Sequence, residues 1–392
     1  MKTQRTLFKN SVLLIAIFAV SLNMRPAITS IGPMLETIRE QLALTNTQVS
    51  LLTALPVICM GIFASLAPVL NHRIGLRRTM YLMIIVIGVM SALRGMVPGY
   101  GILLPTAFVI GIAIAVIGPL LSALIKQNFP EQAAAVIGLY SFGMGMGATI
   151  SAGLTAVFFE ATGSYRFAIS IWGILSLFGW IAWFFAGRGK WAVRQQERKE
   201  RKERGRSPWK VKKAWLFLLF FGLQSSAFFS IITWTVPLAT TAGMTLLQAG
   251  TLLSVMTTFQ IVLNIVLPLL MQRYPARRNW IWFLAGSGMA ATVLLWTGLP
   301  LAMWIGAILM GFPLGGLFPI ALLLPMHETE TAEETNSWTA MMQTGGFIIG
   351  GLLPLLIAMV YDWTANHHFT HAIIMSLYTA MVVIACWLGD KN

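Results

Sequence analysis

Charge is what this sequence lacks most. Only 10% of its 392 residues are Asp, Glu, Lys or Arg, against about 25% in a soluble protein. Hydrophobic residues make up 57% of the chain, and the mean hydropathy is +0.76. So few charges cannot cover a soluble globule of this size. We therefore expect most of the surface to face lipid.

Cysteine and the common catalytic motifs are also scarce. Cys59 and Cys386 each lie in an apolar run, and neither has CxxC or Cys/His spacing, so a disulfide framework or a zinc site has no support. No nucleotide-binding loop of the type G-x-x-x-x-G-K-[ST] occurs, and neither H-E-x-x-H nor G-x-S-x-G is found. We expect no cofactor, no metal, no enzymatic activity and no transport driven by ATP bound to this chain.

Carboxylates and histidines are missing from the middle of the apolar runs, which disfavours a proton relay of the usual Asp, Glu or His kind. Asp362 and His371, near a polar segment, could still titrate. An anion entering an inside-negative cell works against about 2.3 kcal/mol per 100 mV. Uptake of an anion would therefore require exchange or an accompanying proton, and the sequence leaves both open.

Positive charge is present but unevenly spread. The net charge is +14, and the segment RQQERKERKERGR lies between the two halves. A basic, soluble protein would suggest nucleic acid, but this segment mixes Glu with its Arg and has no interleaved aromatics. We interpret it as a cytoplasmic loop obeying the positive-inside rule, able to contact anionic lipid headgroups. The same rule places both termini in the cytoplasm of a multi-pass protein of the bacterial plasma (inner) membrane.

The second half of the chain repeats the first at an offset of 200 residues. The matches are Gln48 and Gln248, Pro68 and Pro268, Arg73 and Arg273, Arg77 and Arg277, Arg78 and Arg278, Gly111 and Gly311, and Pro119 and Pro319. Coincidence could supply one or two of them, but not a run in register. The pattern indicates a duplicated membrane bundle, with a substrate site where the halves meet.

Apolar runs long enough to cross a bilayer, about 20 residues each, number twelve. They lie near 10–31, 47–70, 79–97, 102–125, 133–157, 167–187, 213–240, 247–271, 279–298, 301–325, 336–360 and 369–389. The fold class is therefore an all-α membrane protein with twelve transmembrane helices. We divide it into a six-helix half (1–187), a basic cytoplasmic linker (188–212) and a second six-helix half (213–392). The first run resembles a signal peptide but has no clear cleavage site, so we interpret it as an uncleaved span.

Two motifs resemble known families. HRIGLRR, beginning at His72, is similar to the loop signature of the major facilitator superfamily (MFS), although His72 stands near the place of its usual Asp, and QRYPARR echoes it in the second half. LNMRPAITSIGPML, beginning at Leu22, and SLLTALPVICMG, beginning at Ser50, resemble the branch of cyanate permeases and 2-nitroimidazole exporters. These resemblances imply the MFS fold and a permease for a small solute. They do not fix the solute or the direction of transport.

Arg25 is the most informative single residue, because it lies near the middle of the first span. An arginine there costs roughly 2.5–3.5 kcal/mol on insertion scales. No acidic residue in the core of a span is available to pair with it, so its five fixed donors are free to bind a small planar anion. The alternative is a structural arginine bonded to carbonyls freed near Pro26. Arg94, near the end of the third run, is expected to reach the membrane interface by snorkelling.

Other polar and aromatic residues are candidates for the same substrate site. Thr29 shares a helix face with Arg25, whereas Asn23 is rotated from it and could instead bond a neighbouring helix. In the second half, Trp234 and Trp338 could stack on a planar solute or serve only in packing. The remaining second-half candidates are Gln224, Thr257, Gln260, Asn264 and Gln343.

Conformational change is expected at the repeated positions. We predict gating at Arg73, Arg77 and Arg78 and hinges at Pro119 and Pro319. The glycine-rich segments 143–153 and 345–351 predict either close packing of helices or a sliding surface between the halves. We expect a monomeric secondary transporter that moves a small anion such as cyanate by alternating access. The alternative is an exporter of planar nitroaromatic or drug-like compounds.

Overall fold

The computed structural model describes residues 2–129, 132–187, 207–274, 276–329 and 332–388. These residues form helices and no β-strand. The helices of the first half are α1 (Lys2–Met24), α2 (Pro26–Thr29), α3 (Ile31–Gln41), α4 (Asn46–Ile62), α5 (Leu66–Ile74), α6 (Leu76–Met96), α7 (Tyr100–Asn128), α8 (Ala133–Thr162), α9 (Tyr165–Ser170), η2 (Ile171–Gly173) and α10 (Ile174–Gly187). Those of the second half are η3 (Pro208–Lys210), α11 (Lys212–Thr241), α12 (Leu246–Arg273), α13 (Arg277–Trp296), α14 (Pro300–Glu328), α15 (Ala332–Thr364) and α16 (His368–Leu388).

The described helices provide 11 segments long and apolar enough to cross a membrane, or up to 12 when one bent pair counts as a span. That pair is α4 and α5, which meet at 68°. The first span is also broken, because α1, α2 and α3 together cover Ser11–Gln41. The predicted all-α membrane bundle is confirmed, but the first span runs ten residues past its predicted end at residue 31. Of the predicted linker, residues 188–206 lie outside the described residues.

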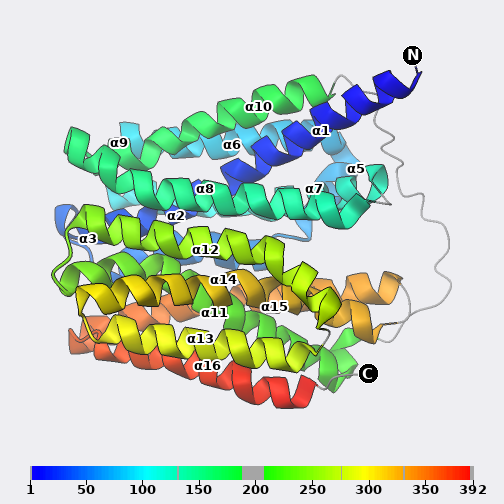
Figure 1. Cartoon of the computed structure of the whole chain (residues 1–392). Helices are drawn as coiled ribbons and strands as arrows, with labels where there is room; N and C mark the ends of the chain where they lie inside the picture. Colours follow the sequence, from blue (N-terminus) through cyan, green and yellow to red (C-terminus); the bar gives the residue numbers. More distant parts are fainter. Residues whose placement is uncertain (1, 130–131, 188–206, 275, 330–331, 389–392) are drawn as a thin grey trace.

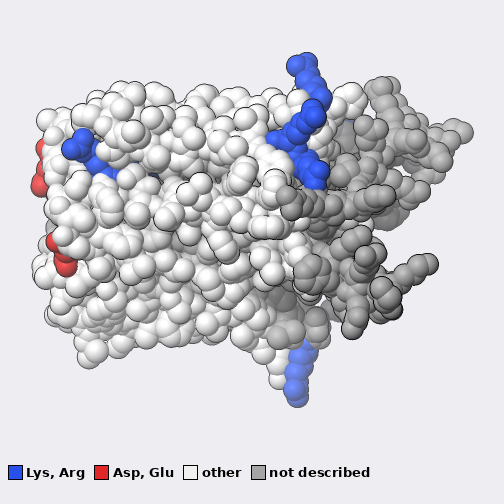
Figure 2. Space-filling model, turned by 90° about the horizontal axis from the view of Figure 1, so that it is seen from above, with Lys and Arg blue, Asp and Glu red and all other residues white. Residues whose placement is uncertain are grey.

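The two halves form two layers (Figure 1). The labelled helices α1, α6, α8, α9 and α10 lie in the upper layer and α11, α13, α14, α15 and α16 in the lower one, with α3 and α12 where the layers meet. Helix α1 begins at the end of the bundle where α16 ends. The face seen in Figure 2 carries no coloured charged residue across its middle. Basic residues lie mainly towards the end where α1 begins, and acidic residues lie at the opposite end, where some basic atoms are also visible. This distribution is the one expected when the middle of the bundle faces hydrocarbon.

Two matching helix starts explain part of the repeat. Thr45 and Gln48 form a capping box at the start of α4, with the backbone N–H of each residue donating to the side chain of the other over 2.9 and 3.1 Å. Thr245 and Gln248 form the same box at the start of α12, over 3.0 and 3.2 Å. The repeated glutamine therefore satisfies backbone donors that a helix start leaves open.

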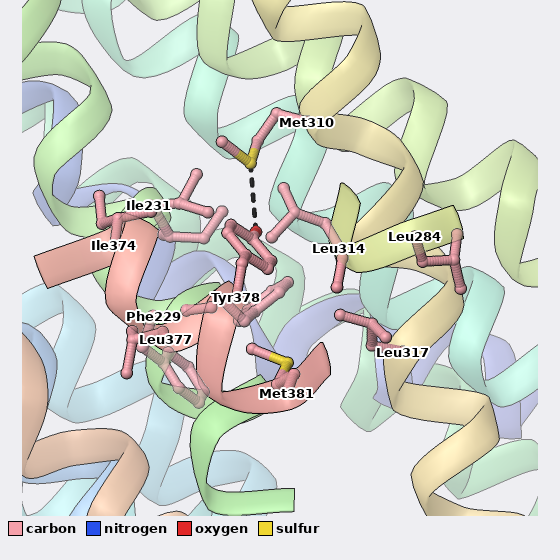
Figure 3. Close-up of a cluster of buried hydrophobic side chains, with 14 of the residues drawn as sticks. Phe229, Ile231, Leu284, Met310, Leu314, Leu317, Ile374, Leu377, Tyr378 and Met381 are labelled. Carbon is pink, nitrogen blue, oxygen red and sulfur yellow. Dashed lines mark hydrogen bonds between the residues drawn. The ribbon is translucent and has the colours of Figure 1, made fainter. Parts of the chain in front are cut away.

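The core of the second half gathers around Tyr378 of α16, which is fully buried. Its hydroxyl donates to Sδ of Met310 over 3.2 Å, and side chains of α11, α13 and α14 surround the ring (Figure 3). This packing joins α16 to the inner helices α11 and α14. The outer helix is therefore fixed by apolar contacts instead of charge pairs.

The halves contact each other along α4 with α15 and along α8 with α12. A Cβ added to Gly351 would lie 2.8 Å from the carbonyl oxygen of Ala54, and one added to Gly145 would lie 2.7 Å from the side chain of Ile261. These glycines face the opposite half. Gly147 and Gly346 instead face α1 and α11 of their own halves. The glycine-rich segments 143–153 and 345–351 therefore pack closely within their own half on one helix face and contact the opposite half on another.

One carboxylate links the halves at the end of the bundle opposite to the termini. Asp362, near the end of α15, accepts hydrogen bonds from the backbone N–H and side chain of Asn46 over 2.9 and 2.8 Å. It accepts two more from the backbone N–H and hydroxyl of Thr47 over 2.9 and 2.6 Å. Since these donors form the first turn of α4, the acidic side chain lies where a helix N-terminus favours negative charge.

Arg94 does not reach the membrane interface as predicted. Its side chain is only 1% exposed. Nη1 donates to the carbonyl oxygen of Ala27 over 2.7 Å, and Nε donates to the hydroxyl of Thr106 over 3.1 Å. The prediction was wrong because it considered only the distance to the end of the helix, whereas the broken first span presents a carbonyl that needs a donor.

Candidate functional site

A cavity lies between the halves, with about 550 Å³ of space not occupied by atoms, including the part open to solvent. Its lining comes from the α1–α2 junction and α8 in the first half, and from α11, α12, α14 and α15 in the second. The lining residues are Arg25, Ser141, Met144, Gly145, Ala148, Gln224, Ser225, Phe228, Phe229, Gln260, Asn264, Leu314, Phe318 and Phe347. A site shared by both halves is the arrangement that the repeat predicted.

Arg25 lies between α1 and α2, where the first span breaks. Pro26 has no N–H to donate to the preceding turn, so the helix cannot continue unchanged through it. The carbonyl of Arg25 accepts hydrogen bonds from the N–H groups of Ile28 and Thr29 over 2.9 and 3.0 Å, which starts the short helix α2. The backbone around Arg25 is therefore satisfied locally, and the side chain projects from the break towards the cavity.

The guanidinium of Arg25 has aromatic neighbours rather than acidic ones. Its Cζ lies 5.2 Å from the ring centre of Phe228 and 5.4 Å from that of Phe229. Within the described part of the chain, the buried Nη1 has no hydrogen-bond partner, and the three ion pairs found there do not include Arg25. Two rings stabilise the cation partially, but at least one strong donor remains available to a ligand.

Amide side chains form the other polar part of the cavity wall. Gln224 of α11 and Gln260 and Asn264 of α12 all line it, and the last two are one helical turn apart. Oε1 of Gln224 accepts a hydrogen bond from the hydroxyl of Ser225 over 3.3 Å. Oε1 of Gln260 is buried without a partner among the described residues. The structure thus brings together four of the predicted binding residues, Arg25 among them.

Two predicted residues of the first span lie outside this cavity. The hydroxyl of Thr29 is 2.6 Å from that of Ser151 in α8 and 3.0 Å from the carbonyl oxygen of Arg25. Oδ1 of Asn23 accepts from the hydroxyl of Ser176 in α10 over 3.0 Å. Both therefore bond neighbouring helices of the first half, which is a common role for polar residues in spans.

Four predicted residues of the second half also lie outside the cavity lining. Nε1 of Trp234 donates to the carbonyl of Pro354 over 3.3 Å. Trp338 packs against Phe217 with ring centres 5.8 Å apart. The hydroxyl of Thr257 donates to the carbonyls of Leu253 and Ser254 over 3.1 Å each. The fourth is Gln343, which is half-buried in α15.

The sequence analysis missed the aromatic part of the lining. Phe228 and Phe229 follow Gln224 and Ser225 by four residues each, so they share their helix faces. That spacing would have identified them once Gln224 was placed in the site. Their rings meet edge to face, with centres 5.1 Å apart. Phe318, Phe347 and Ser141 carry no comparable signal, because only the packing of α8, α14 and α15 around the cavity brings them there.

The predicted gating residues lie away from the cavity lining. Arg73 is in the last turn of α5, and Arg77 and Arg78 are in the first turn of α6, with exposed side chains. Pro119 lies inside α7 and Pro319 inside α14. Among the described residues, no group of three or more His, Cys, Asp or Glu side chains could hold a metal ion.

Comparison with known proteins supports the resemblance drawn from the motifs. The Major Facilitator Superfamily model matches residues 13–351. The uncharacterized transporter YycB of Bacillus subtilis (strain 168) is 30% identical over 383 residues, with 96% of this chain and 92% of YycB covered. From Escherichia coli (strain K12), the cyanate transport protein CynX is 26% identical, with 91% of each chain covered. The 2-nitroimidazole transporter of that organism is also 26% identical, covering 91% of this chain and 90% of its own.

A solved structure agrees on the fold. The nucleoside transporter NupG has a TM-score of 0.73 with this chain, at 12% sequence identity, with 96% of this chain and 98% of NupG covered. The match extends over nearly the whole of both chains. It supports the arrangement of the helices alone, because identity this low carries no information on the substrate.

Proposed function

Because the chain belongs to the Major Facilitator Superfamily, we propose that it is a secondary transporter that moves a small solute by alternating access, binding it beside Arg25. The family and the three transporter relatives make the chain a multi-span membrane transporter for a small molecule, and not an enzyme. The binding residues, the solute and the gating positions are what we propose.

The observation that carries the proposal is the unpaired Nη1 of Arg25 in a cavity shared by both halves. A buried donor on a charged group costs free energy until a ligand satisfies it. A small anion would do so, and its binding would add an interaction that the empty site lacks. Cyanate is the anion named for the relative CynX, and it is the first candidate.

A second candidate is a planar nitroaromatic compound, moved outwards. Phe228 and Phe229 flank Arg25, and Phe318 and Phe347 also line the cavity. Rings on the wall favour a flat aromatic solute whose polar oxygens meet the guanidinium. The relative named as a 2-nitroimidazole transporter agrees with this candidate.

We place the protein in the bacterial plasma membrane with both termini in the cytoplasm, as a monomer. The basic residues towards the end of the bundle where α1 begins and α16 ends support this orientation. We retain Arg73, Arg77 and Arg78 as gating residues and Pro119 and Pro319 as hinge positions. Their support is the exact repeat of all five at an offset of 200 residues.

The decisive experiment measures binding and flux with the purified protein. Thermal stabilisation by cyanate and by 2-nitroimidazole is compared for the wild type, Arg25→Met and Arg25→Lys, and uptake of the stabilising compound into proteoliposomes is then followed. We expect Arg25→Met to weaken binding by about 10- to 100-fold, the value of a charge-assisted hydrogen bond. Lys126→Met, which removes an exposed charge from the last turn of α7, is the control and should bind as the wild type does.

The two candidates give different results in this assay. Stabilisation by cyanate alone favours the anion, whereas stabilisation by 2-nitroimidazole alone favours the nitroaromatic exporter. Equal stabilisation of the wild type and Arg25→Met would remove Arg25 from the binding site. Binding without flux in proteoliposomes would contradict the transport function.

A further inference from the structure

Two buried polar atoms of opposite hydrogen-bonding character line the same cavity without partners in the described structure. Nη1 of Arg25 is a donor, and Oε1 of Gln260 is an acceptor. Gln260 as a whole is only 8% exposed, so bulk water does not satisfy its oxygen freely. Buried polar atoms normally have partners, and two such exceptions in one cavity suggest a ligand that meets both.

Gln260 differs in this respect from Gln224, the other glutamine in the cavity. Oε1 of Gln224 already accepts a hydrogen bond from the hydroxyl of Ser225. Gln260 has no such neighbour within its own helix, although the hydroxyls of Thr257 and Thr258 on α12 bond to backbone carbonyls. Among the buried acceptor atoms of the lining, the amide oxygen of Gln260 is therefore the one without a partner in the described structure.

We propose that Gln260 determines substrate specificity by accepting a hydrogen bond from an N–H group of the substrate, while Arg25 donates to acceptor oxygens of the same molecule. This inference rests on the proposed binding site at Arg25 and deepens it. The substrate class is a small planar conjugated molecule with an N–H donor and a carboxylate, nitro or similar group. Phe228 and Phe229, beside the guanidinium, provide the flat surfaces that such a molecule contacts.

A ligand of this class would also join the two halves. Arg25 belongs to the first half and Gln260 to α12 of the second. The cyanate anion offers only acceptors, so it would leave Oε1 of Gln260 unpaired. A site with a buried acceptor discriminates against ligands that lack the matching donor, because the acceptor then loses its hydrogen bond to water without replacement.

The test uses two pairs of compounds that differ in the N–H group. The first pair is 2-nitroimidazole and 1-methyl-2-nitroimidazole, and the second is pyrrole-2-carboxylate and its 1-methyl analogue. Dissociation constants are measured with the full-length purified protein for the wild type, Gln260→Met and Thr258→Val. For at least one pair, we expect the wild type to bind the N–H compound about tenfold more tightly than its methyl analogue.

Gln260→Met separates hydrogen bonding from the bulk of the methyl group. It keeps the length of the side chain and removes the acceptor, so the ratio of the two dissociation constants should fall to about one. Thr258→Val changes an exposed residue of the same helix and should keep the wild-type ratio. A ratio that survives in Gln260→Met, or a wild-type ratio near one in both pairs, overturns the role of Gln260.

The results also distinguish this inference from the proposed function. Equal binding of both members of a pair, with binding lost in Arg25→Met, refutes Gln260 as the acceptor and leaves the Arg25 site intact. Failure of all four compounds and of cyanate to bind the wild type overturns both proposals.

Discussion

The first spans of the two halves occupy corresponding positions in the repeat but have different backbones. In the first half the span divides into α1, α2 and α3, with Arg25 and Ser30 at the divisions, whereas α11 runs unbroken from Lys212 to Thr241. Residue 225, which corresponds to Arg25 at the offset of 200, is a serine and lines the same cavity. The two halves thus share a frame, and a difference in one span supplies the charge of the cavity.

The break in the first span also needs support that α11 does not. Arg94 of α6 donates to the carbonyl of Ala27, beside the break. The corresponding residue of the second half is Leu294. The chain therefore has two arginines near one break. Nε and Nη1 of Arg94 have protein partners and its Nη2 has none among the described residues, whereas Arg25 lines the cavity and its buried Nη1 has no partner there. Because these two arginines differ in their partners, substituting each one tests the comparison between the broken first span and the unbroken α11.

The largest expected effect is on Arg94. Arg94→Met would remove hydrogen bonds from a charged donor to Ala27 and Thr106, and we expect the free energy of unfolding to fall by about 3 kcal/mol. Arg25→Met should leave thermal stability unchanged or raise it, because it removes a buried charge whose Nη1 has no partner in the described structure. Thermal unfolding in detergent measures both. Equal losses in the two variants would contradict the distinction between them.

A smaller effect is expected at Asp362, which caps α4 across the two halves. The start of α12 has the same capping box, but the residue corresponding to Asp362 is Thr162. Asp362→Asn should lower the free energy of unfolding by about 1–2 kcal/mol, since charged acceptors at a helix N-terminus bond more strongly than neutral ones. Glu160→Gln, an exposed carboxylate of α8, is the control. A similar loss there would show that the effect is not specific to the contact between the halves.

The loop after α15 gives a pH dependence at a position where the first half has Phe167. Burial, together with the nearby His371, lowers the pKa of His367 from 6.5 to about 4, although Glu36 acts in the opposite direction. The ring stacks on Tyr361 with centres 4.0 Å apart. The folded state therefore keeps His367 neutral where the unfolded state binds a proton. This contribution to stability is present above pH 6.5 and is lost as the pH falls towards 4.

The residue that corresponds to His367 in the first half is Phe167. The variant His367→Phe therefore tests the contribution of the histidine. Between pH 7 and pH 5, its unfolding temperature should decrease less than that of the wild type. Equal decreases in the two proteins would mean that His367 is not the group responsible. The aromatic ring retains a stacking surface but loses the 3.3 Å contact of Nδ1 with the hydroxyl of Thr370. The comparison therefore uses the change between the two pH values and not the unfolding temperature at either one.

The smallest effect concerns the turns before α4 and α12. Ala43 has a positive φ of 50°, and Gly243, its counterpart, has a φ of 93°. Ala43→Gly should raise the free energy of unfolding by about 0.5–1 kcal/mol, because it relieves the left-handed conformation. Gly243→Ala should lower it, and no atom lies within 4 Å of the added Cβ to confuse the result. Changes of opposite sign in the free energy of unfolding would support equivalent turns in the two halves. Changes of the same sign would contradict that equivalence.

Much of the fold followed from the length of the apolar runs and from the repeat. The twelve apolar runs and the repeated glutamines at 48 and 248 each have local causes that a sequence displays. The site was harder to predict. Arg25 was recognisable because its charge is unusual in a span. Thr257 and Gln260 look equally suitable on α12, yet only Gln260 lines the cavity.

Local sequence alone determined that this chain would form long apolar helices in two related halves, because hydrophobic runs and helix starts depend on neighbouring residues. Which of Arg25 and Arg94 lines the cavity was decided by the tertiary structure. Arg94 meets the carbonyl that the break exposes, and Arg25 meets two phenylalanine rings of the other half. The partners of a charge come from distant helices, and only their packing determines whether that charge is satisfied.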